Sequence, residues 1–272
     1  MSLITMTGGI GCGIREVAGE VARRLDVELF DDERLQNVAL DIGFSSQDLK
    51  AFDEKAPGLL DRLFRRSPET YDELMAAVIY EVARRGDGVI IGHGSPFFLK
   101  DFTCALHVRM RASKAFRTER VASRMQVERQ TAEELIARRD AELKGFLHFI
   151  LRIDWGDLSP YDLVLNVDKI GTDAAVSLTV HLAETNAIAA CTLNALEAME
   201  RLSLQKRVEV ALIKANISLQ ELGIEVPQPG VVKLTGLIDP MRTVAGVSEV
   251  VRQVPGVEKV VSAAERHPMA EL

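Results

Sequence analysis

The sequence predicts an α/β fold, in which a parallel β-sheet lies between two layers of helices. Short apolar runs rich in β-branched residues alternate with longer segments whose apolar residues recur at helical spacing. Strands that are apolar almost throughout are typical of a parallel sheet buried on both faces. With 272 residues, the chain is long enough for one large domain or two. The expected strands are 3–6, 27–30, 88–92, 104–110 and 161–167.

Helical periodicity is clearest directly after the first strand. Apolar residues recur at spacings of three and four over residues 14–25, while charged side chains occupy the opposite face. A long helical stretch over 175–200 follows the last strand of the sheet. These elements predict one large three-layer domain over residues 1–190.

A smaller unit follows, because the pattern changes after residue 203. We expect a second, α+β domain over 204–266, with residues 191–203 as a helical linker. Its charges nearly balance, so the acidic surplus of the chain falls in the large domain. The expected order is a helix at 204–222, strands at 224–226 and 231–238 around the turn PQPG, a helix at 241–253 and a strand at 257–262.

Charge and composition exclude several classes of partner. The formal net charge of −7 gives no general attraction to nucleic acid or to an anionic membrane. No apolar run approaches the roughly 20 residues that span a bilayer. The N-terminus lacks the basic region and apolar stretch of a secretory signal, so we expect a cytoplasmic protein.

Neither the cysteines nor the histidines predict a metal centre or a disulfide framework. Cys12, Cys104 and Cys191 are far apart and odd in number, which fits reduced thiols in a cytoplasm. The five histidines show no zinc-ligand spacing with them. We therefore expect no protein-bound metal, while Mg²⁺ carried by a nucleotide remains compatible with the sequence.

A glycine-rich segment, GGIGCGIRE at 8–16, connects the first strand to the first helix, where a phosphate-binding loop would lie. Backbone N–H groups in such a turn face an anion, the helix N-terminus adds partial positive charge, and glycines leave room for the phosphate. Gly8 and Gly13 fit the P-loop spacing, although Ile14 replaces its lysine and Arg15 its serine or threonine. The expected phosphate-binding residues are Gly8, Gly9, Gly11, Cys12, Gly13, Ile14, Arg15 and Glu16.

Two other interpretations of this loop stay open. The glycines could simply form a tight turn between strand and helix. A dinucleotide-binding fold is also suggested by Asp31 and Asp32, which end a strand about 20 residues downstream, where a ribose-binding acid would lie. The GxGxxG pattern is absent, however, because Glu16 occupies the third glycine position counted from Gly11.

Four segments, in order, resemble the cytidylate kinase-like family of P-loop nucleoside monophosphate kinases. The family's opening is similar to ITMTGGIGCGIREVAGEVARRLDVELFDDERL, and its strand and GRG segment to VIIGHGSPFFLKD at 89–101. Its lid helix and Asp-Trp dipeptide are similar to ARRDAELKGFLHFILRIDW at 137–155, and its last strand to SPYDLVLNVDKIG at 159–171. The resemblance covers roughly residues 3–185. It implies a fold that binds ATP with Mg²⁺ and a nucleoside monophosphate.

Three positions depart from the family's cations. His93 stands where the GRG segment has an arginine suited to a substrate phosphate, and Leu143 where the lid has the arginine of its Asp-x-x-Arg pair, which begins here at Asp140. Ile14 replaces the Walker lysine, which the family often lacks, so Arg15 is the conspicuous cation of the loop. Phosphoryl transfer depends on positioning and on neutralising charge, so these losses weaken the case for catalysis.

Other side chains could compensate. Arg117, Arg120 and Arg124 share one helical face where the family's lid begins; they could close over nucleotide phosphates or be surface residues paired with acids. Asp31 could face the substrate or cap the next helix. Cys12 is expected to be a small residue that fits the loop, or alternatively a thiol whose pKa the helix N-terminus lowers. The catalytic candidates are Arg15, Arg120 and Arg124, and the substrate-binding candidates are Asp31, His93 and Asp140.

The C-terminal unit resembles a BON domain over residues 208–262. The resemblance rests on the strand GVVKLTG, a helix with an alanine and glycine run, and PGVEKVV. It implies binding of phospholipids or other ligands, although neither charge nor a signal segment supports a membrane here. The alternative is a packing or dimerisation module, whose exposed strand edge could pair with a protein partner or a second copy.

Two functions of different classes follow from these patterns. The first is a kinase that transfers the γ-phosphoryl group of ATP to a nucleoside monophosphate, which is CMP by resemblance. The second is a catalytically degenerate kinase domain that binds a nucleotide without turnover and acts as a sensor or scaffold through its BON-like domain. Both require nucleotide binding at the phosphate loop.

Overall fold

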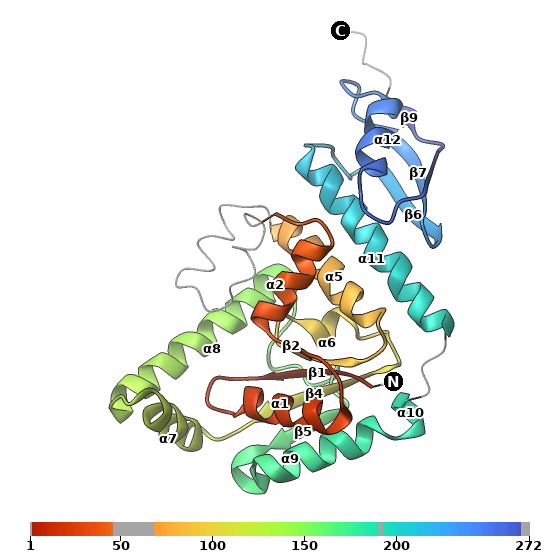
Figure 1. The fold of residues 1–272 in the computed structure, drawn as a ribbon. Coiled ribbons are helices and arrows are strands. Elements are labelled where there is room, and N and C mark those ends of the chain that lie inside the picture. The colour runs from red at the N-terminus through yellow and green to blue at the C-terminus, as the bar shows by residue number, and fades with distance from the viewer. Residues whose placement is uncertain (1, 46–67, 190–192, 268–272) are drawn as a thin grey trace.

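The N-terminal part of the chain is built on a parallel sheet (Figure 1). The computed structural model describes residues 2–45, 68–189 and 193–267. The sheet has five strands in the order β2-β3-β1-β4-β5, and every neighbouring pair is parallel, which confirms the predicted α/β class. The strands are β1 Leu3–Gly8, β2 Leu29–Phe30, β3 Gly88–Ile91, β4 Ala105–Arg111 and β5 Leu163–Asn166.

Helices cover both faces of this sheet, because successive side chains of its strands point to opposite sides. On β1, Leu3 packs into one core and Ile4 and Met6 pack into the other, and all three are 0% exposed. The first core includes side chains of α2, α5 and α8, and the second those of α1 and α9. The helices are α1 Ile14–Leu25, α2 Asp32–Asp41, α5 Pro68–Ala83, α6 Ser95–Phe98, α8 Arg129–Leu151, α9 Val167–Ala183 and α10 Asn186–Ala189.

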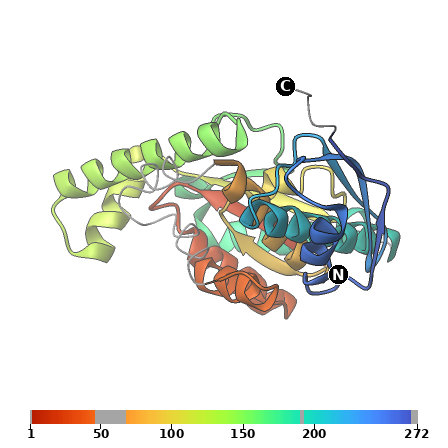
Figure 2. The same ribbon diagram turned by 90° about the horizontal axis from the view of Figure 1, so that it is seen from above.

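A helical hairpin, formed by α7 (Lys114–Met125) and α8, projects from one side of the sheet (Figures 1 and 2). Val121, Ala132 and Ile136 form a small core between its helices, and Ile10 packs against that core. Ile10 belongs to the segment between β1 and α1, residues 9–13, which we call the glycine-rich loop. The hairpin therefore contacts this loop directly.

A second sheet lies beyond α11 (Leu193–Lys214), at the C-terminal end (Figure 1). β6 and β7 pair antiparallel, whereas β8 and β9 each pair with β7 in parallel, so this sheet is mixed. α12 (Val244–Arg252) and the C-terminal half of α11 pack on it around a separate core that includes Val208, Leu234 and Val251. The strands are β6 Leu222–Gln228, β7 Val231–Ile238, β8 Lys259–Ser262 and β9 Glu265–Arg266.

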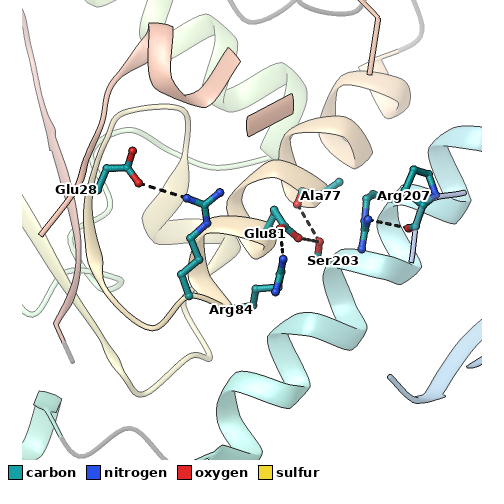
Figure 3. A network of polar contacts seen from close by, with 8 residues as sticks. Glu28, Ala77, Glu81, Arg84, Ser203 and Arg207 are labelled. Carbon is teal, nitrogen blue, oxygen red and sulfur yellow. Dashed lines mark hydrogen bonds and ion pairs between the residues drawn. The ribbon is translucent and has the colours of Figure 1, made fainter. Parts of the chain in front are cut away.

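The helix α11 also packs along α5, and polar contacts connect it to both parts of the chain (Figure 3). The buried hydroxyl of Ser203 donates a hydrogen bond to Glu81 at 3.0 Å, and Arg84 donates one to the other oxygen of this carboxylate at 2.6 Å. Farther along α11, Arg207 donates a hydrogen bond to the carbonyl oxygen of Pro255 at 2.9 Å. These two donors supply the hydrogen bonds that a buried carboxylate requires.

The structure corrects the predicted helix over 175–200, which is interrupted. The helix α9 ends at Ala183, and α11 begins at Leu193. The Thr185 hydroxyl donates a hydrogen bond to the carbonyl oxygen of Leu182 at 2.7 Å, and a local side-chain bond of this kind competes with helix continuation.

The structure also shortens the helix predicted over 204–222. Asn216 adopts the left-handed conformation, with φ 56°, just after α11 ends at Lys214, which is a common helix terminator. Leu222 then pairs with Gly236 in the second sheet. The helix α11 runs without interruption through residue 203, where we expected the linker to meet the small domain.

The cysteines differ from the sequence expectation at one position. Cys104 is disulfide-bonded, so the expectation of reduced thiols is wrong there. Sequence spacing could not show this, because disulfide formation depends on distance in the fold. Cys12 is a free, buried thiol, and Cys191 lies outside the described residues. Among the helices that the structure describes, none combines the length and the apolar character needed to cross a membrane.

Candidate functional site

The glycine-rich loop turns sharply from β1 into α1. Gly11 and Gly13 have positive φ angles of 88° and 78°, in the region that favours glycine. The N–H of Cys12 donates a hydrogen bond to the carbonyl oxygen of Gly9 at 3.2 Å. No side chain of the described residues caps the N-terminus of α1. Its first backbone N–H groups therefore keep their capacity to bind an anion.

A cavity of about 1210 Å³ opens over this loop. Its walls are the loop, the start of α1, the residues after β3 and the hairpin of α7 and α8. It lies at the carboxyl ends of β1, β3 and β4, the edge at which parallel α/β sheets bind ligands. The arginines on its wall are Arg15 of α1, Arg109 of β4, Arg120 and Arg124 of α7, and Arg139 of α8.

Acidic side chains pair with the arginines nearest to the loop. The guanidinium of Arg15 lies 2.8 Å from the carboxylate of Asp32 and 3.5 Å from that of Asp31. The guanidinium of Arg120 lies 2.7 Å from the carboxylate of Glu16. The side chains of Arg15 and Arg120 are 44% and 32% exposed, so these pairs contribute little to stability. A phosphate group could therefore compete with the carboxylates for both arginines.

The loop glycines make room for α7 as well as for a ligand. A Cβ atom on Gly9 would lie 2.7 Å from the guanidinium of Arg117, and one on Gly11 would lie 2.8 Å from the Arg117 carbonyl oxygen. A Cβ atom on Gly13 would lie 2.9 Å from the guanidinium of Arg120. From the sequence, these glycines were expected to leave room for a phosphate or to form a tight turn between strand and helix. The structure adds close packing against two arginines of the hairpin.

Two of the predicted substrate-binding residues lie on the cavity wall, and the third is adjacent to it. Asp31 is the N-cap of α2, where its side chain accepts a hydrogen bond from the N–H of Arg34 at 3.2 Å. The acid that lines the cavity is its neighbour Asp32. His93 and Asp140 both line the cavity.

His93 occupies a constrained position directly after β3. Its backbone is left-handed, with φ 55°, and its side chain is 0% exposed. Its Nε2 lies 3.0 Å from the Oδ1 of Asp32. Asp32 therefore contacts both Arg15 and His93. At position 93 the family resemblance implies an arginine that binds a substrate phosphate. This chain has an imidazole there, which is hydrogen-bonded to the Asp32 carboxylate.

Burial decides the chemistry of Cys12. Its thiol is 2% exposed, and desolvation raises its pKa above the ordinary value, although the nearby guanidinium of Arg117 opposes this. The alternative of a reactive thiol with a lowered pKa is therefore wrong. Leu143 lines the cavity and packs against the core beneath it, so no cation replaces the lid arginine at this position.

Sequence reasoning missed Arg109, which lies on the cavity wall and is 6% exposed. Its guanidinium lies over the ring of Trp155, at 4.7 Å from the centroid, and over that of Tyr161, at 5.6 Å. Trp155 packs against the core and also lines the cavity. A charged residue in the middle of an apolar strand was the signal that could have identified Arg109.

A protein-bound metal has no obvious ligand set here. Within residues 2–45, 68–189 and 193–267, no group of three or more histidine, cysteine, aspartate or glutamate side chains is placed to hold a metal ion.

Comparison with known proteins supports a kinase-type fold for the N-terminal part. The model of the cytidylate kinase-like family matches residues 3–169. A cytidylate kinase of Pyrobaculum islandicum is 25% identical over 182 residues, which cover 66% of this chain and 91% of that protein. One of Pyrobaculum aerophilum is 26% identical over 181 residues, with the same coverage of 66% and 91%.

A solved structure shares the fold at a similar coverage. It is an uncharacterized protein from Eubacterium ventriosum, with a TM-score of 0.50 and 21% sequence identity. The match covers 68% of this chain and 99% of that chain. The family model ends at residue 169, before α11 and the second sheet.

Proposed function

Because the chain belongs to the cytidylate kinase-like family, we propose that it binds ATP with Mg²⁺ and transfers the γ-phosphoryl group to a nucleoside monophosphate. CMP is the proposed acceptor, by resemblance and because the Pyrobaculum relatives carry the name cytidylate kinase. The observation that carries the proposal is the uncapped N-terminus of α1, which adjoins a 1210 Å³ cavity with arginines on several of its walls.

The proposed donor site is the glycine-rich loop. The backbone N–H groups of residues 9–14 would hold the phosphates of ATP, and the N-terminal charge of α1 would stabilise them. Arg15 would leave Asp32 and bind a phosphate oxygen, since this pair is partly exposed and weak. Mg²⁺ carried by ATP would neutralise part of the phosphate charge.

The hairpin of α7 and α8 is the proposed lid. Arg120 and Arg124 of α7 line the cavity and would contact the transferring phosphoryl group when ATP is bound. Arg120 would exchange Glu16 for a phosphate oxygen. Asp32 and His93 would face the acceptor, together with Asp31 at the start of α2.

A second function is favoured by the side chains at positions 93 and 143. His93 is bonded to Asp32, and Leu143 offers no charge, so two sites that could neutralise phosphate carry no arginine. We therefore keep as the alternative a domain that binds nucleotide without turnover. Such a domain would act through the C-terminal unit as a sensor or scaffold.

For the C-terminal unit we propose a BON-type domain, with residues 204–266 as its extent and 191–203 as the linker. Support comes from the sequence resemblance and from the separate core around the mixed sheet. We also propose that the protein works in the cytoplasm, where both proposed substrates occur.

Calorimetry and product analysis separate the two functions. The full chain would be titrated with ATP–Mg²⁺ and with CMP, and then assayed for ADP release with a panel of nucleoside monophosphates. Release of ADP that depends on CMP supports the kinase, and the double variant His93→Arg, Leu143→Arg should then raise the rate. Binding of ATP without ADP release for any acceptor contradicts the kinase and supports the alternative. Absence of any nucleotide binding contradicts both.

A further inference from the structure

Arg109 is a buried cation that has no acidic partner in the described part of the chain. It is 6% exposed, and its only hydrogen bonds within the described part of the chain are long ones from NH1 to the hydroxyls of Thr7, at 3.5 Å, and Tyr161, at 3.3 Å. Its Nε, also buried, has no hydrogen-bond partner among these residues. A guanidinium carries five N–H donors, so most of the hydrogen-bonding capacity of Arg109 is unused.

Burying the Arg109 guanidinium with most of its donors unused is unfavourable in free energy. Contacts with two aromatic rings compensate for only part of this cost. The ring faces of Trp155, at 4.7 Å, and Tyr161, at 5.6 Å, attract the guanidinium. They cannot replace an anion, because a buried charge is stable only when it is paired and hydrogen-bonded. The indole Nε1 of Trp155 is likewise buried and lacks an acceptor in the described residues. Two donors on one cavity wall thus lack acceptors.

The topology explains why Arg109 reaches the cavity. Its neighbours on β4, Val108 and Met110, pack into the core on the α1 side of the sheet. Arg109 therefore points to the opposite face, where it lies beside its cross-strand partner Thr7 at the carboxyl end of β1. Arg109 and Trp155 line the large cavity and also an adjoining one of about 330 Å³, and Gly9 lines both cavities as well.

We propose that Arg109 and the indole N–H of Trp155 form a subsite for the phosphate monoester of the acceptor molecule, distinct from the glycine-rich loop. The identification of that monoester as an acceptor rests on the kinase function proposed above. A phosphate dianion offers the several acceptor oxygens that the two unpartnered donors require. Arg117 also lines the smaller cavity, but Asp140 and the carbonyl oxygen of Ile10 already occupy its donors.

The position of the subsite suits the transfer. Because Gly9 lines both cavities, an acceptor phosphate at Arg109 would lie next to a donor bound at the loop. An oxygen of the acceptor phosphate would form a bond to the γ-phosphorus of ATP, while the bond between that phosphorus and the β–γ bridging oxygen breaks. ADP leaves with the electron pair, and no additional reactant is needed.

Trp155 is the single tryptophan of the chain, so its fluorescence can report ligand binding at this subsite. The emission of the full-length protein would be followed in titrations with CMP, with inorganic phosphate and with cytidine, which lacks the phosphate. We expect CMP and phosphate to change the emission, and cytidine to bind at least about 10-fold more weakly than CMP. Arg109→Met should weaken CMP and phosphate binding by about 10- to 100-fold.

Two further variants keep the result interpretable. Arg138→Met removes the same charge from a side chain that is 64% exposed and lines neither cavity, and it should bind CMP as the parent protein does. Arg109→Lys keeps the charge but loses the planar fork, so it should fold normally and still bind phosphate more weakly. Thermal unfolding of each variant shows whether a loss of binding reflects a loss of fold.

The outcomes separate this subsite from the kinase function. The subsite is wrong if phosphate and CMP cause no emission change that depends on Arg109, or if cytidine binds as tightly as CMP. If phosphate binding depends on Arg109 but ATP releases no ADP with any monophosphate, the subsite stands and the kinase function fails. If ADP is released and Arg109→Lys and Arg109→Met leave the KM for CMP unchanged, the kinase stands and the subsite fails.

Discussion

The guanidinium of Arg117 donates two hydrogen bonds to the carboxylate of Asp140, from NH1 at 2.8 Å and from NH2 at 2.7 Å. Its Nε donates a third to the carbonyl oxygen of Ile10 at 2.7 Å. One side chain of α7 thereby connects the glycine-rich loop to both helices of the hairpin. The Arg117 side chain is 11% exposed, so its guanidinium is better shielded from water than those of Arg15 and Arg120.

Arg117→Met should therefore destabilise the fold and loosen the hairpin. It removes three hydrogen bonds and leaves Asp140 without its cation, so we expect the free energy of unfolding to fall by about 1–3 kcal/mol. Urea denaturation measures this directly. Arg129→Met, which breaks a pair whose arginine is 69% exposed, is the matched control and should change stability by less than about 0.5 kcal/mol. Equal effects of the two variants would contradict the bridging role of Arg117.

Two glycine substitutions should have opposite effects. In Gly11→Ala, the new Cβ would lie 2.8 Å from the Arg117 carbonyl oxygen on a backbone with φ 88°, so the loop must distort. We expect a loss of about 1–3 kcal/mol in stability and weaker binding of ATP. In Gly19→Ala, on the same segment of chain, the Cβ meets nothing within 4 Å, and the better helix former should stabilise α1 by about 0.5–1 kcal/mol. Thermal unfolding and an ATP titration of both variants test the pair.

Asp32→Asn should increase the affinity for ATP. The change removes a negative charge from the cavity wall and releases Arg15, which lies 2.8 Å from this carboxylate, to bind a phosphate. An increase of about 3- to 10-fold in the association constant is expected from calorimetry. Asp41→Asn, at the exposed end of the same helix, is the control for net charge. Unchanged or weaker ATP binding by Asp32→Asn would show that Arg15 does not contact the nucleotide.

Stability should fall as the pH rises from about 4.5 to about 7 because of Glu73. The pKa of Glu73 is raised to about 7, chiefly by burial and also by the neighbouring Glu209, while Lys206 opposes the shift. A carboxyl whose pKa is higher in the folded state than its ordinary value of 4.5 stabilises the fold below pH 4.5, and this stabilisation is lost between that pH and about 7. We expect a loss of about 1–2 kcal/mol from this residue.

Comparison with Glu73→Gln isolates this contribution. The variant cannot ionise at this position, so its Tm should decline less than that of the parent protein between pH 5 and pH 8. Glu225→Gln, whose side chain is 61% exposed, is the control and should keep the parent profile. Parallel pH profiles for the parent protein and Glu73→Gln would refute the assignment.

Much of the fold follows from local sequence patterns. The strands of the parallel sheet, the first helix and the glycine-rich turn were all predictable, because apolar runs, helical periodicity and glycine spacing act within a few residues of one another. The least accurate predictions concerned helix ends. Thr185 and Asn216 interrupt or end helices by local hydrogen bonding and backbone conformation, and such effects are weaker in the sequence than the periodicity around them.

The candidate site also combines features that the sequence predicts with features that only the tertiary structure shows. The sequence by itself determined the glycine-rich turn before α1 and the family, since both depend on short segments of residues that are close along the chain. Only the tertiary structure decided that Asp32 rather than Asp31 lines the cavity and that His93 is hydrogen-bonded to Asp32. It also decided that Arg109 is buried with no acid beside it among the residues that the structure describes. These facts depend on which side chains from distant segments meet, and on whether a charge inside the fold finds a partner, which no local pattern encodes.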